Sequence, residues 1–288
     1  MTSAVWNACD RAAALPMQPE FDYGCATVDF PKGLRPEAGW FVMTASFQLP
    51  SGMGIAGMGK GGAWNYWRPL SRDIVELGVV CGQDVSLPVH FHDEDQLTFV
   101  LSGRRRFLIG DMPVDVAPGR GVRIPAGTPH SSLSEPADVF CINIYTPPAA
   151  CDAAALFAGM ALRWRQGSID WPDLAAMIGT HRCEAGMPAQ RVEAITPSWE
   201  TVGEGARLAG MSREGFSRRF RRQHGVAPQL FRLSERLNEA RRLLRAGDPV
   251  AAVAAEAGFS DQSHLGRCFR RAFGVTPGQY RRNLPPAP

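Results

Sequence analysis

Short apolar runs alternate with turn residues through the middle of the chain. The runs are Val79-Val80, Leu97–Leu101, Phe107–Ile109, Val114–Val116, Val122–Ile124 and Val139–Tyr145. The turns between them contain Gly103, Gly110, Pro113, Pro118-Gly119 and Pro125-Ala126-Gly127. Apolar runs of this length, bounded by glycine and proline, are typical of antiparallel strands. Residues 78–145 are therefore predicted to form a small β-barrel or jelly roll.

Toward the C-terminus the apolar positions change to helical spacing. Phe216 and Phe220 are four residues apart, as are Leu265 and Phe269, and arginine and serine occupy the positions between and around them. Each pair marks the buried face of an amphipathic helix with a cationic outer side. A third apolar series predicts a helix of about fifteen residues that links the other two. Its members are Leu230, Leu233, Leu237, Ala240 and Leu244.

The two basic segments are copies of one unit, because Ser212–Phe231 aligns with Asp261–Tyr280 at an offset of 49 residues. The identities are Arg218/Arg267, Phe220/Phe269, Arg221/Arg270, Arg222/Arg271, Gly225/Gly274, Val226/Val275 and Pro228/Pro277. A short helix precedes each copy, at Val202–Ala209 and Val250–Ala257, followed by the turns Gly210-Met211-Ser212 and Gly258-Phe259-Ser260. Glycine is expected to end the first helix of each unit and serine to cap the second. This arrangement predicts two helix-turn-helix units, each able to place a helix in the major groove of DNA.

The segment between the barrel and the repeat has a third character. Residues 149–166 are rich in alanine and are expected to be helical, as is Trp171–Ile178, with breaks at Gly186-Met187-Pro188 and Thr196-Pro197. The chain is thus predicted to be an α+β multidomain protein, with a barrel at 1–148, a helical linker at 149–196 and an all-α domain at 197–288. The apolar face of the first linker helix packs either on the barrel or on a second subunit; it consists of Ala154, Phe157, Ala158, Ala161 and Leu162.

The distribution of charge agrees with this division. Residues 1–199 hold 15 Lys and Arg against 20 Asp and Glu, and residues 200–288 hold 16 against 8, so the formal charges are −5 and +8. A basic C-terminal third favours a polyanionic partner, although a solvated basic surface gives the same count.

Cysteine usage and the N-terminal region bear on the compartment. Seven cysteines without a C-x-x-C pair, and a first twenty residues without a basic leader or an apolar run, favour reduced thiols in the cytoplasm. Ala38–Gly59 is uncharged over a length that could span a bilayer, but Gln48-Leu49-Pro50-Ser51-Gly52 and the glycines that follow would break a helix in lipid. This stretch is expected to be a strand followed by a loop, and no membrane partner is expected.

Three of the six histidines lie in the predicted barrel, with His90 and His92 before a strand and His130 after a turn. The pattern they form resembles both sequence motifs of the cupin superfamily and includes Gly82, Gln96, Gly103, Gly119, Pro125 and Gly127. The resemblance covers about Gly82–Ser134 and implies that His90, His92, Gln96 and His130 occupy metal-ligand positions. Gln96 stands where glutamate is usual, and three imidazoles with a neutral amide suit Zn, Ni, Cu or Fe. The alternative is a barrel without metal, whose histidines are polar residues of a small-molecule pocket.

Other residues near the barrel are candidates for an effector site. Trp64, Tyr66, Trp67 and Arg68 are expected to line or cover the barrel mouth, with an aromatic core or a dimer contact as the alternative. Arg104-Arg105-Arg106 is interpreted as a solvated strand edge or turn, with contact to an anionic effector as the alternative.

The C-terminal repeat points to a known family. The sequence GFSDQSHLGRCFRRAFGVTPGQYRR, with RLNEARRLL upstream, resembles the DNA-binding domain of AraC/XylS-type transcription regulators over roughly Trp199–Arg282. The first unit departs from the pattern, because Gly215 lies inside its second helix and Arg219 and His224 replace positions that are usually apolar. The resemblance implies a DNA-binding regulator that forms a homodimer through its linker region.

Exposed polar side chains of both units are candidates for contact with DNA. Arginine can pair with guanine and glutamine with adenine, so residues early in each second helix are expected to read base edges. They are Arg213, Glu214, Ser217 and Arg218 in the first unit and Gln262, Ser263, His264 and Arg267 in the second. Arginines further along are expected to hold phosphates, which adds affinity but no sequence information. These are Arg221, Arg222, Arg270 and Arg271, and a solvated surface charge is the alternative for each.

These features together predict a sequence-specific DNA-binding transcription regulator whose cupin domain senses a small molecule or a metal ion. The expected partners are a double-stranded DNA operator, the effector, a second copy of the chain and, for an activator, RNA polymerase. The alternative is a metal-dependent cupin enzyme, an oxygenase or isomerase, that carries a DNA-binding appendage. Nonspecific DNA packaging would spread basic residues over the whole chain, and here they are concentrated in two units.

Overall fold

The computed structural model describes residues 46–48, 63–69, 71, 73–166, 168–183 and 199–282. All of them belong to one compact unit, Ala45–Pro288. Within these ranges, none of the helices combines the length and the apolar character that a bilayer crossing needs. The breaks at Gly186-Met187-Pro188 and Thr196-Pro197, and with them the expected boundary between linker and C-terminal domain, lie outside the described residues.

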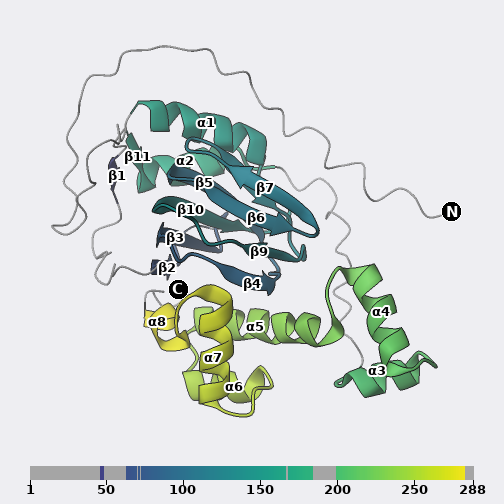
Figure 1. Cartoon of the computed structure of the whole chain (residues 1–288). Coiled ribbons are helices and arrows are strands. Elements are labelled where there is room, and N and C mark those ends of the chain that lie inside the picture. Colours follow the sequence, from purple (N-terminus) through teal and green to yellow (C-terminus); the bar gives the residue numbers. More distant parts are fainter. Residues whose placement is uncertain are drawn as a thin grey trace. The chain divides into compact units, whose positions relative to one another are not determined.

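The N-terminal domain is a jelly roll of two antiparallel sheets (Figure 1). The larger sheet has the order β2-β3-β10-β5-β8, with β2 at Ala63–Trp67, β3 at Glu76–Gly82, β5 at Asp95–Ser102, β8 at Gly121–Ile124 and β10 at Val139–Thr146. The smaller has the order β4-β9-β6-β7, with β4 at Leu87–His90, β6 at Arg105–Ile109, β7 at Met112–Val116 and β9 at His130–Ser132. This confirms the predicted fold class. The short strands β2, β4 and β9 were not predicted, because their apolar positions are too few to give a periodic signal.

A separate pair of short strands lies apart from the two sheets. β1 (Ser46–Gln48) runs parallel to β11 (Ser168–Asp170). β1 falls within the uncharged stretch Ala38–Gly59, for which a strand followed by a loop was expected, and the rest of that stretch lies outside the described residues.

Alternation along the strands buries the larger sheet on both faces. Successive side chains of a strand point to opposite faces. On β5, Leu97 and Phe99 point outward, where they pack with Leu156 and Met160 of α1 (Ala153–Arg165). Helix α2 (Trp171–Thr180) covers the same face (Figure 1). The first linker helix thus packs on the barrel, but mainly through Leu156 and Met160; of the predicted face, Ala154, Ala158 and Leu162 are exposed. The continuous apolar runs of the sequence follow from the burial of the sheet on both faces.

The arginine run at the start of β6 is not the solvated edge that the sequence suggested. Arg104 and Arg106 are partly exposed and pair with Asp115 and Glu135. Arg105 is 1% exposed because it occupies an inward-facing strand position. Its guanidinium donates to two backbone carbonyl oxygens, at 2.7 and 3.0 Å, and lies 5.1 Å from the centre of the Phe107 ring. That interpretation is therefore wrong for Arg105.

The C-terminal domain contains the two predicted helix-turn-helix units. The first consists of α3 (Val202–Leu208) and α4 (Arg213–His224), and the second of α6 (Val250–Glu256) and α7 (Gln262–Phe273). Between them α5 (Pro228–Ala246) is 19 residues long, which exceeds the predicted fifteen because Pro228 at its first position starts the helix earlier. A last helix, α8 (Pro277–Arg282), follows the second unit.

A serine was expected to cap the second helix of each unit, and this is correct for the first unit and wrong for the second. Ser212 caps α4, where its hydroxyl accepts a hydrogen bond from the backbone N–H of Gly215 at 3.1 Å. In the second unit the cap is Asp261 and not Ser260, because the Asp261 carboxylate accepts from the His264 N–H at 2.7 Å. Both second helices end at a glycine in the left-handed conformation, Gly225 and Gly274, each with φ of 75°.

Truncation of a core aromatic tests the predicted helix face. Phe269 is fully buried on α7, so Phe269→Ala should lower the free energy of unfolding by about 3–5 kcal/mol, the range for large aromatic truncations. Urea unfolding of the variant measures this loss. The exposed neighbour Arg270→Ala is the matched control and should be close to neutral. An unchanged midpoint for Phe269→Ala would contradict the assigned face.

Substitution at the second cap distinguishes the two candidate residues. Asp261→Ala should lower the unfolding midpoint because it removes the acceptor for the His264 N–H. Ser260→Ala, which leaves that acceptor in place, should have the smaller effect. Thermal unfolding of both variants checks the order, and the reverse order would assign the cap to Ser260.

A candidate metal centre and a candidate DNA interface

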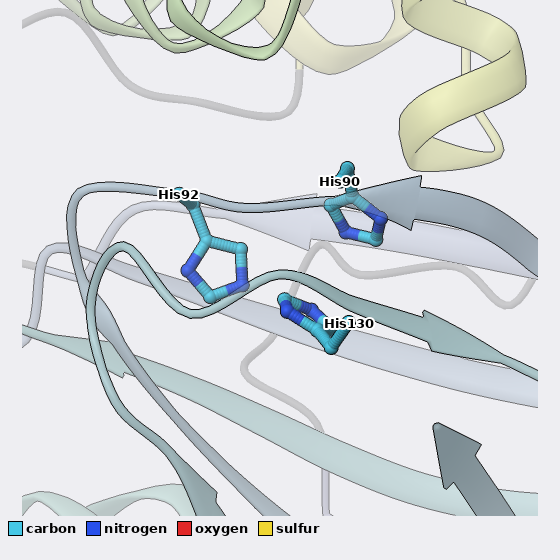
Figure 2. A group of neighbouring side chains, drawn as sticks. All are labelled: His90, His92 and His130. Carbon is cyan, nitrogen blue, oxygen red and sulfur yellow. The ribbon is translucent and has the colours of Figure 1, made fainter. Parts of the chain in front are cut away.

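The three barrel histidines converge inside the jelly roll (Figure 2). His90 ends β4 and is paired across the sheet with His130, the first residue of β9, while His92 lies just beyond β4. The ring centres of His90 and His130 are 4.5 Å apart, and those of His92 and His130 are 4.9 Å apart. One ring nitrogen from each histidine lies within 4.8 Å of the others. His90 and His92 are two residues apart and both face the cluster, as they would in a continuous strand, although β4 ends at His90.

Backbone carbonyl groups orient all three imidazole rings in the same way. Nδ1 of His90 lies 2.8 Å from the Pro88 oxygen, Nδ1 of His92 lies 2.8 Å from the Glu94 oxygen, and Nδ1 of His130 lies 2.9 Å from the Thr128 oxygen. A carbonyl oxygen only accepts, so each Nδ1 carries the proton and donates it. In neutral rings this leaves every Nε2 with a free lone pair. An imidazole held by its other nitrogen in this way is the usual state of a histidine metal ligand.

Burial keeps the three rings neutral. It lowers the pKa of His90 to about 3, with a further contribution from neighbouring His92. Burial also lowers the pKa of His92, assisted by the positive charge of Arg241, and lowers the pKa of His130 well below its ordinary value. Neutral imidazole is the form that binds a metal ion.

Gln96 turns its amide oxygen toward the cluster. The Thr98 hydroxyl donates to Asn143 Oδ1 at 2.7 Å and accepts from Gln96 Nε2 at 2.9 Å. This chain of donors leaves Gln96 Oε1 facing His92 Nε2 at 2.9 Å. With the Gln96 and Asn143 amides oriented in this way, the two nitrogens of neutral His92 both face oxygen acceptors, so one of the two contacts joins two lone pairs. A cation bound by His92 Nε2 and Gln96 Oε1 removes this conflict, so the donor set fits a metal ion.

The pocket around the histidines is narrow. It is lined by Trp64, Tyr66, Leu87, His90, Gln96, Phe107, His130, Ser132 and Tyr145, and it has room for little more than one water molecule. Two of the four residues expected at an effector site, Trp64 and Tyr66, thus lie at the pocket. Trp67 points to the opposite face of the sheet, where it packs in the core beneath α1 and α2, and Arg68 reaches the Arg245 carbonyl oxygen instead.

Sequence reasoning missed several polar residues of this interior. Thr98, Asn143 and Tyr145 reach it because they alternate with outward-facing apolar residues on β5 and β10. That alternation was present in Leu97–Leu101 and Val139–Tyr145, so it could have identified them. Glu76 and Glu94 were also missed, and no local pattern marks them as buried.

Most candidate DNA contacts lie on exposed surfaces of α4 and α7. Arg218, Arg221 and Arg222 of α4 are exposed, as are Arg267, Arg270 and Arg271 of α7. Glu214, Gln262 and Ser263 are exposed near the helix starts, while Ser217 and His264 are half-buried. Two of the candidates have contacts of their own. The Arg213 guanidinium lies against Gly203 of α3, and His264 Nδ1 lies 3.1 Å from the Ser260 hydroxyl.

Comparison with known proteins matches both halves of the chain. A helix-turn-helix domain model matches residues 206–283, and a cupin domain model matches residues 80–143. The transcriptional regulator LumQ of Photobacterium leiognathi is 26% identical over 69% of this chain and 93% of its own length. The HTH-type transcriptional regulator MtrA of Neisseria gonorrhoeae is 41% identical over 26% of this chain, a match that spans only 25% of MtrA. The DNA-binding domain of AdpA, solved in complex with a target DNA, is 39% identical over 29% of this chain and 77% of that domain, with a TM-score of 0.28.

The chain therefore contains a cupin domain followed by a helix-turn-helix domain, and its C-terminal part is similar to the DNA-binding part of transcription regulators, among them a putative AraC-like regulator of Streptomyces antibioticus that is 37% identical over 31% of this chain. The cupin domain precedes the helix-turn-helix domain in the sequence, as the resemblance implied. The curated relatives are transcription regulators and not enzymes.

Proposed function

We propose that this chain is a metal-responsive transcription regulator. In this proposal His90, His92 and His130 bind a divalent transition metal through Nε2, and Gln96 Oε1 is the fourth protein donor. A bound dication would join donors from β4, β9 and β5 and so fix these strands relative to one another. Three imidazoles and an amide oxygen favour Zn, Ni, Cu or Fe over Mg or Ca, which prefer carboxylates and water.

The orientation of the three histidines is the observation that supports this proposal most directly. Each Nδ1 donates to a backbone carbonyl two residues away along the chain, which leaves Nε2 of each ring to bind a cation, and one ring nitrogen of each histidine lies within 4.8 Å of the others. Histidines that served only as polar pocket residues would have no reason to share one orientation. The contact between His92 Nε2 and Gln96 Oε1 adds an electrostatic reason for a cation at this point.

An organic effector is the second candidate ligand. The aromatic residues Trp64, Tyr66 and Tyr145 line the same pocket and favour an apolar or planar molecule. The present cavity is too small for one, so this ligand would require the barrel mouth to open. A cupin enzyme would need comparable access for its substrate, and the curated relatives are regulators.

The proposed output of the regulator is operator binding by the two helix-turn-helix units. Arg213, Glu214, Ser217 and Arg218, and Gln262, Ser263, His264 and Arg267, would read base edges. Arg221, Arg222, Arg270 and Arg271 would hold phosphates. A homodimer, contact with RNA polymerase at activated promoters, and a cytoplasmic location complete the proposal.

Elemental analysis of untagged protein tests the metal centre. The wild-type chain should carry close to one equivalent of Zn, Ni, Cu or Fe, and the His90→Ala/His92→Ala variant should carry none, because two of the three imidazole ligands are lost. His181→Ala is the matched control, since His181 lies outside the cluster and should leave the metal content unchanged. A wild-type chain without metal, even after incubation with salts of all four metals, would contradict the proposal.

Arg267→Ala separates base reading from phosphate binding. If the side chain reads a base, affinity for duplexes selected by the wild-type protein should fall by about 1–3 kcal/mol, and affinity for random DNA should change much less. Arg271→Ala, expected to lose a phosphate contact, should weaken both equally. Fluorescence anisotropy at fixed salt measures the six constants, for the wild type and both variants on the two DNAs. An equal loss on both DNAs for Arg267→Ala would reassign it to phosphate.

A further inference from the structure

The second helix-turn-helix unit lies directly against the residues that line the histidine pocket. Phe273, the last residue of α7, approaches the His90 ring edge-on, with ring centres 6.0 Å apart. Its carbonyl oxygen accepts a hydrogen bond from the Tyr66 hydroxyl at 3.0 Å. The next residue, Gly274, is so close to the Trp64 indole that a Cβ there would lie 2.3 Å from the ring. Three pocket-lining residues are thus covered from outside by the end of α7.

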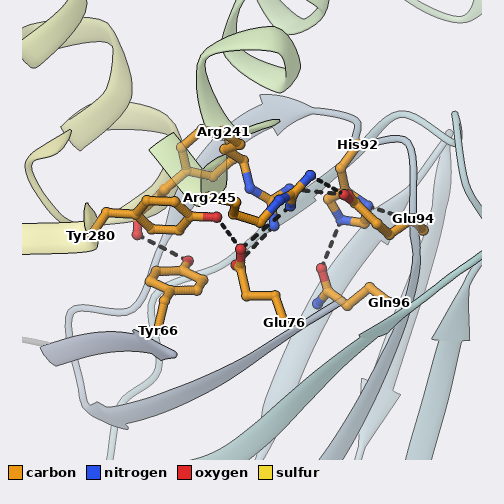
Figure 3. A network of polar contacts seen from close by, with 9 residues as sticks. Tyr66, Glu76, His92, Glu94, Gln96, Arg241, Arg245 and Tyr280 are labelled. Atoms are coloured by element: carbon orange, nitrogen blue, oxygen red, sulfur yellow. Dashed lines mark hydrogen bonds and ion pairs between the residues drawn. The ribbon is translucent and has the colours of Figure 1, made fainter. Parts of the chain in front are cut away.

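A cluster of four charges holds α5, which packs against the second unit, on the barrel (Figure 3). Arg241 of α5 pairs with Glu76 of β3 at 2.9 Å and with Glu94 at 3.4 Å. Arg245, one turn later, pairs with Glu94 at 2.7 Å and with Glu76 at 3.5 Å. The Tyr280 hydroxyl of α8 donates to Glu76 as well. The two positive charges of the arginines equal the two negative charges of the glutamates. Charges that are removed from water need such pairing, because an unpaired buried charge is strongly unfavourable.

The charge cluster is directly joined to the histidine site. The Glu94 carboxylate pairs with the arginines, while its backbone oxygen holds His92 Nδ1. The Arg241 guanidinium lies 4.9 Å from the ring centre of Tyr145, which lines the pocket and meets the His92 ring edge-on. The Glu94 carboxylate is therefore paired with both arginines, while its backbone holds a histidine of the cluster.

The two helix-turn-helix units differ in how they meet the barrel. The core of the second unit, with Leu265, Phe269 and Phe273, is continuous with the barrel interior. The first unit has a separate core, formed by Trp199, Ala206, Phe216 and Phe220. Only the second unit shares its core with the pocket among the described residues.

We propose that the second helix-turn-helix unit is the lid of the histidine pocket, held shut by the cluster of Glu76, Glu94, Arg241 and Arg245. A ligand then enters or leaves the pocket when this unit lifts from the barrel mouth. Any ligand larger than an ion favours the lifted arrangement, because the closed pocket has room for little more than a water molecule. The contacts between the barrel and the helices support the lid. They do not depend on whether the ligand is the metal of the proposed function.

The test of the lid measures how easily a reagent reaches the pocket. The surface of α7 that carries the DNA-binding candidates is exposed even when the second unit covers the barrel. Arg267, Arg270 and Arg271 are exposed while the unit is docked, so DNA affinity alone would not report lid opening. Acylation of histidines by diethyl pyrocarbonate, mapped by mass spectrometry on the metal-free full chain, reports access directly. His181 is an internal reference, since it lies outside the pocket.

Two arginines that are neighbours on α5 provide a matched pair of variants. Arg241→Gln removes the central cation of the cluster, whereas Arg242→Gln removes an exposed arginine that pairs only with Glu239 on the same helix among the described contacts. Arg241→Gln should accelerate acylation of His90 and His130 by at least about tenfold, the factor that about 1.4 kcal/mol gives, relative to His181. Arg242→Gln should match the wild type. Amide hydrogen exchange should show loss of protection in α7 and α8 for Arg241→Gln only.

Glu94→Gln provides a second test in case Arg241→Gln fails to fold. It removes one charge of the cluster with little change of shape, and it keeps the backbone oxygen that holds His92. It should accelerate acylation in the same direction as Arg241→Gln. Wild-type His90 and His130 that react as fast as His181 would overturn the lid, as would unchanged acylation in a variant whose α7 and α8 have lost protection.

Removal of zinc by EDTA from zinc-loaded chains adds a second readout. It should be at least about tenfold faster for Arg241→Gln than for Arg242→Gln. Equal rates in chains that hold zinc would count against the lid. A wild-type chain that takes up no zinc would remove support from the proposed metal centre alone, because the acylation rates still decide the lid.

Discussion

Side chains alternate between the two faces of β5 and β10, and this alternation organises both the core and the candidate site. Outward positions such as Phe99 and Ile144 are apolar and carry α1 and α2, so the larger sheet is covered on that face. Inward positions of the same strands hold Gln96, Thr98, Asn143 and Tyr145. Gln96, Thr98 and Asn143 are adjacent across the two strands and form a hydrogen-bonded chain that places the Gln96 amide oxygen 2.9 Å from His92 Nε2. One pattern thus builds the apolar core and the polar site on opposite faces of one sheet.

The cost of burying polar groups explains why the site and the C-terminal domain are joined. Each histidine Nδ1 has a carbonyl acceptor, both buried carboxylates of the mouth have arginine partners, and Glu76 also accepts from the Tyr280 hydroxyl. The partners of Glu76 and Glu94 come from α5 and α8 and not from the barrel. Separation of the two domains would expose these carboxylates to water or leave them unpaired, so the state of the barrel mouth and the position of the second helix-turn-helix unit are energetically linked.

Several local features could be read from the sequence, and their failures have local causes. The repeat, the long apolar strands and the linking helix were predictable because each depends on periodicity within one segment. The cap of α7 was assigned to the wrong residue because Ser260 and Asp261 are adjacent and both are good caps, and only backbone geometry at Asp261 decides between them. Arg105 was taken as solvated because three consecutive arginines conceal which one faces inward.

Glycine turns and apolar periods are local patterns, so the amino-acid sequence predicted a small barrel followed by two helix-turn-helix units, and its motifs resembled those of cupins and AraC-type regulators. That Trp67 faces away from the pocket while Trp64 and Tyr66 face it became clear from the fold, since it depends on the sheet to which β2 is added. The same holds for the meeting of Glu76 with Arg241, which are 165 residues apart in the chain. Their pairing follows from how two independently patterned domains pack, and no periodicity within either domain encodes it.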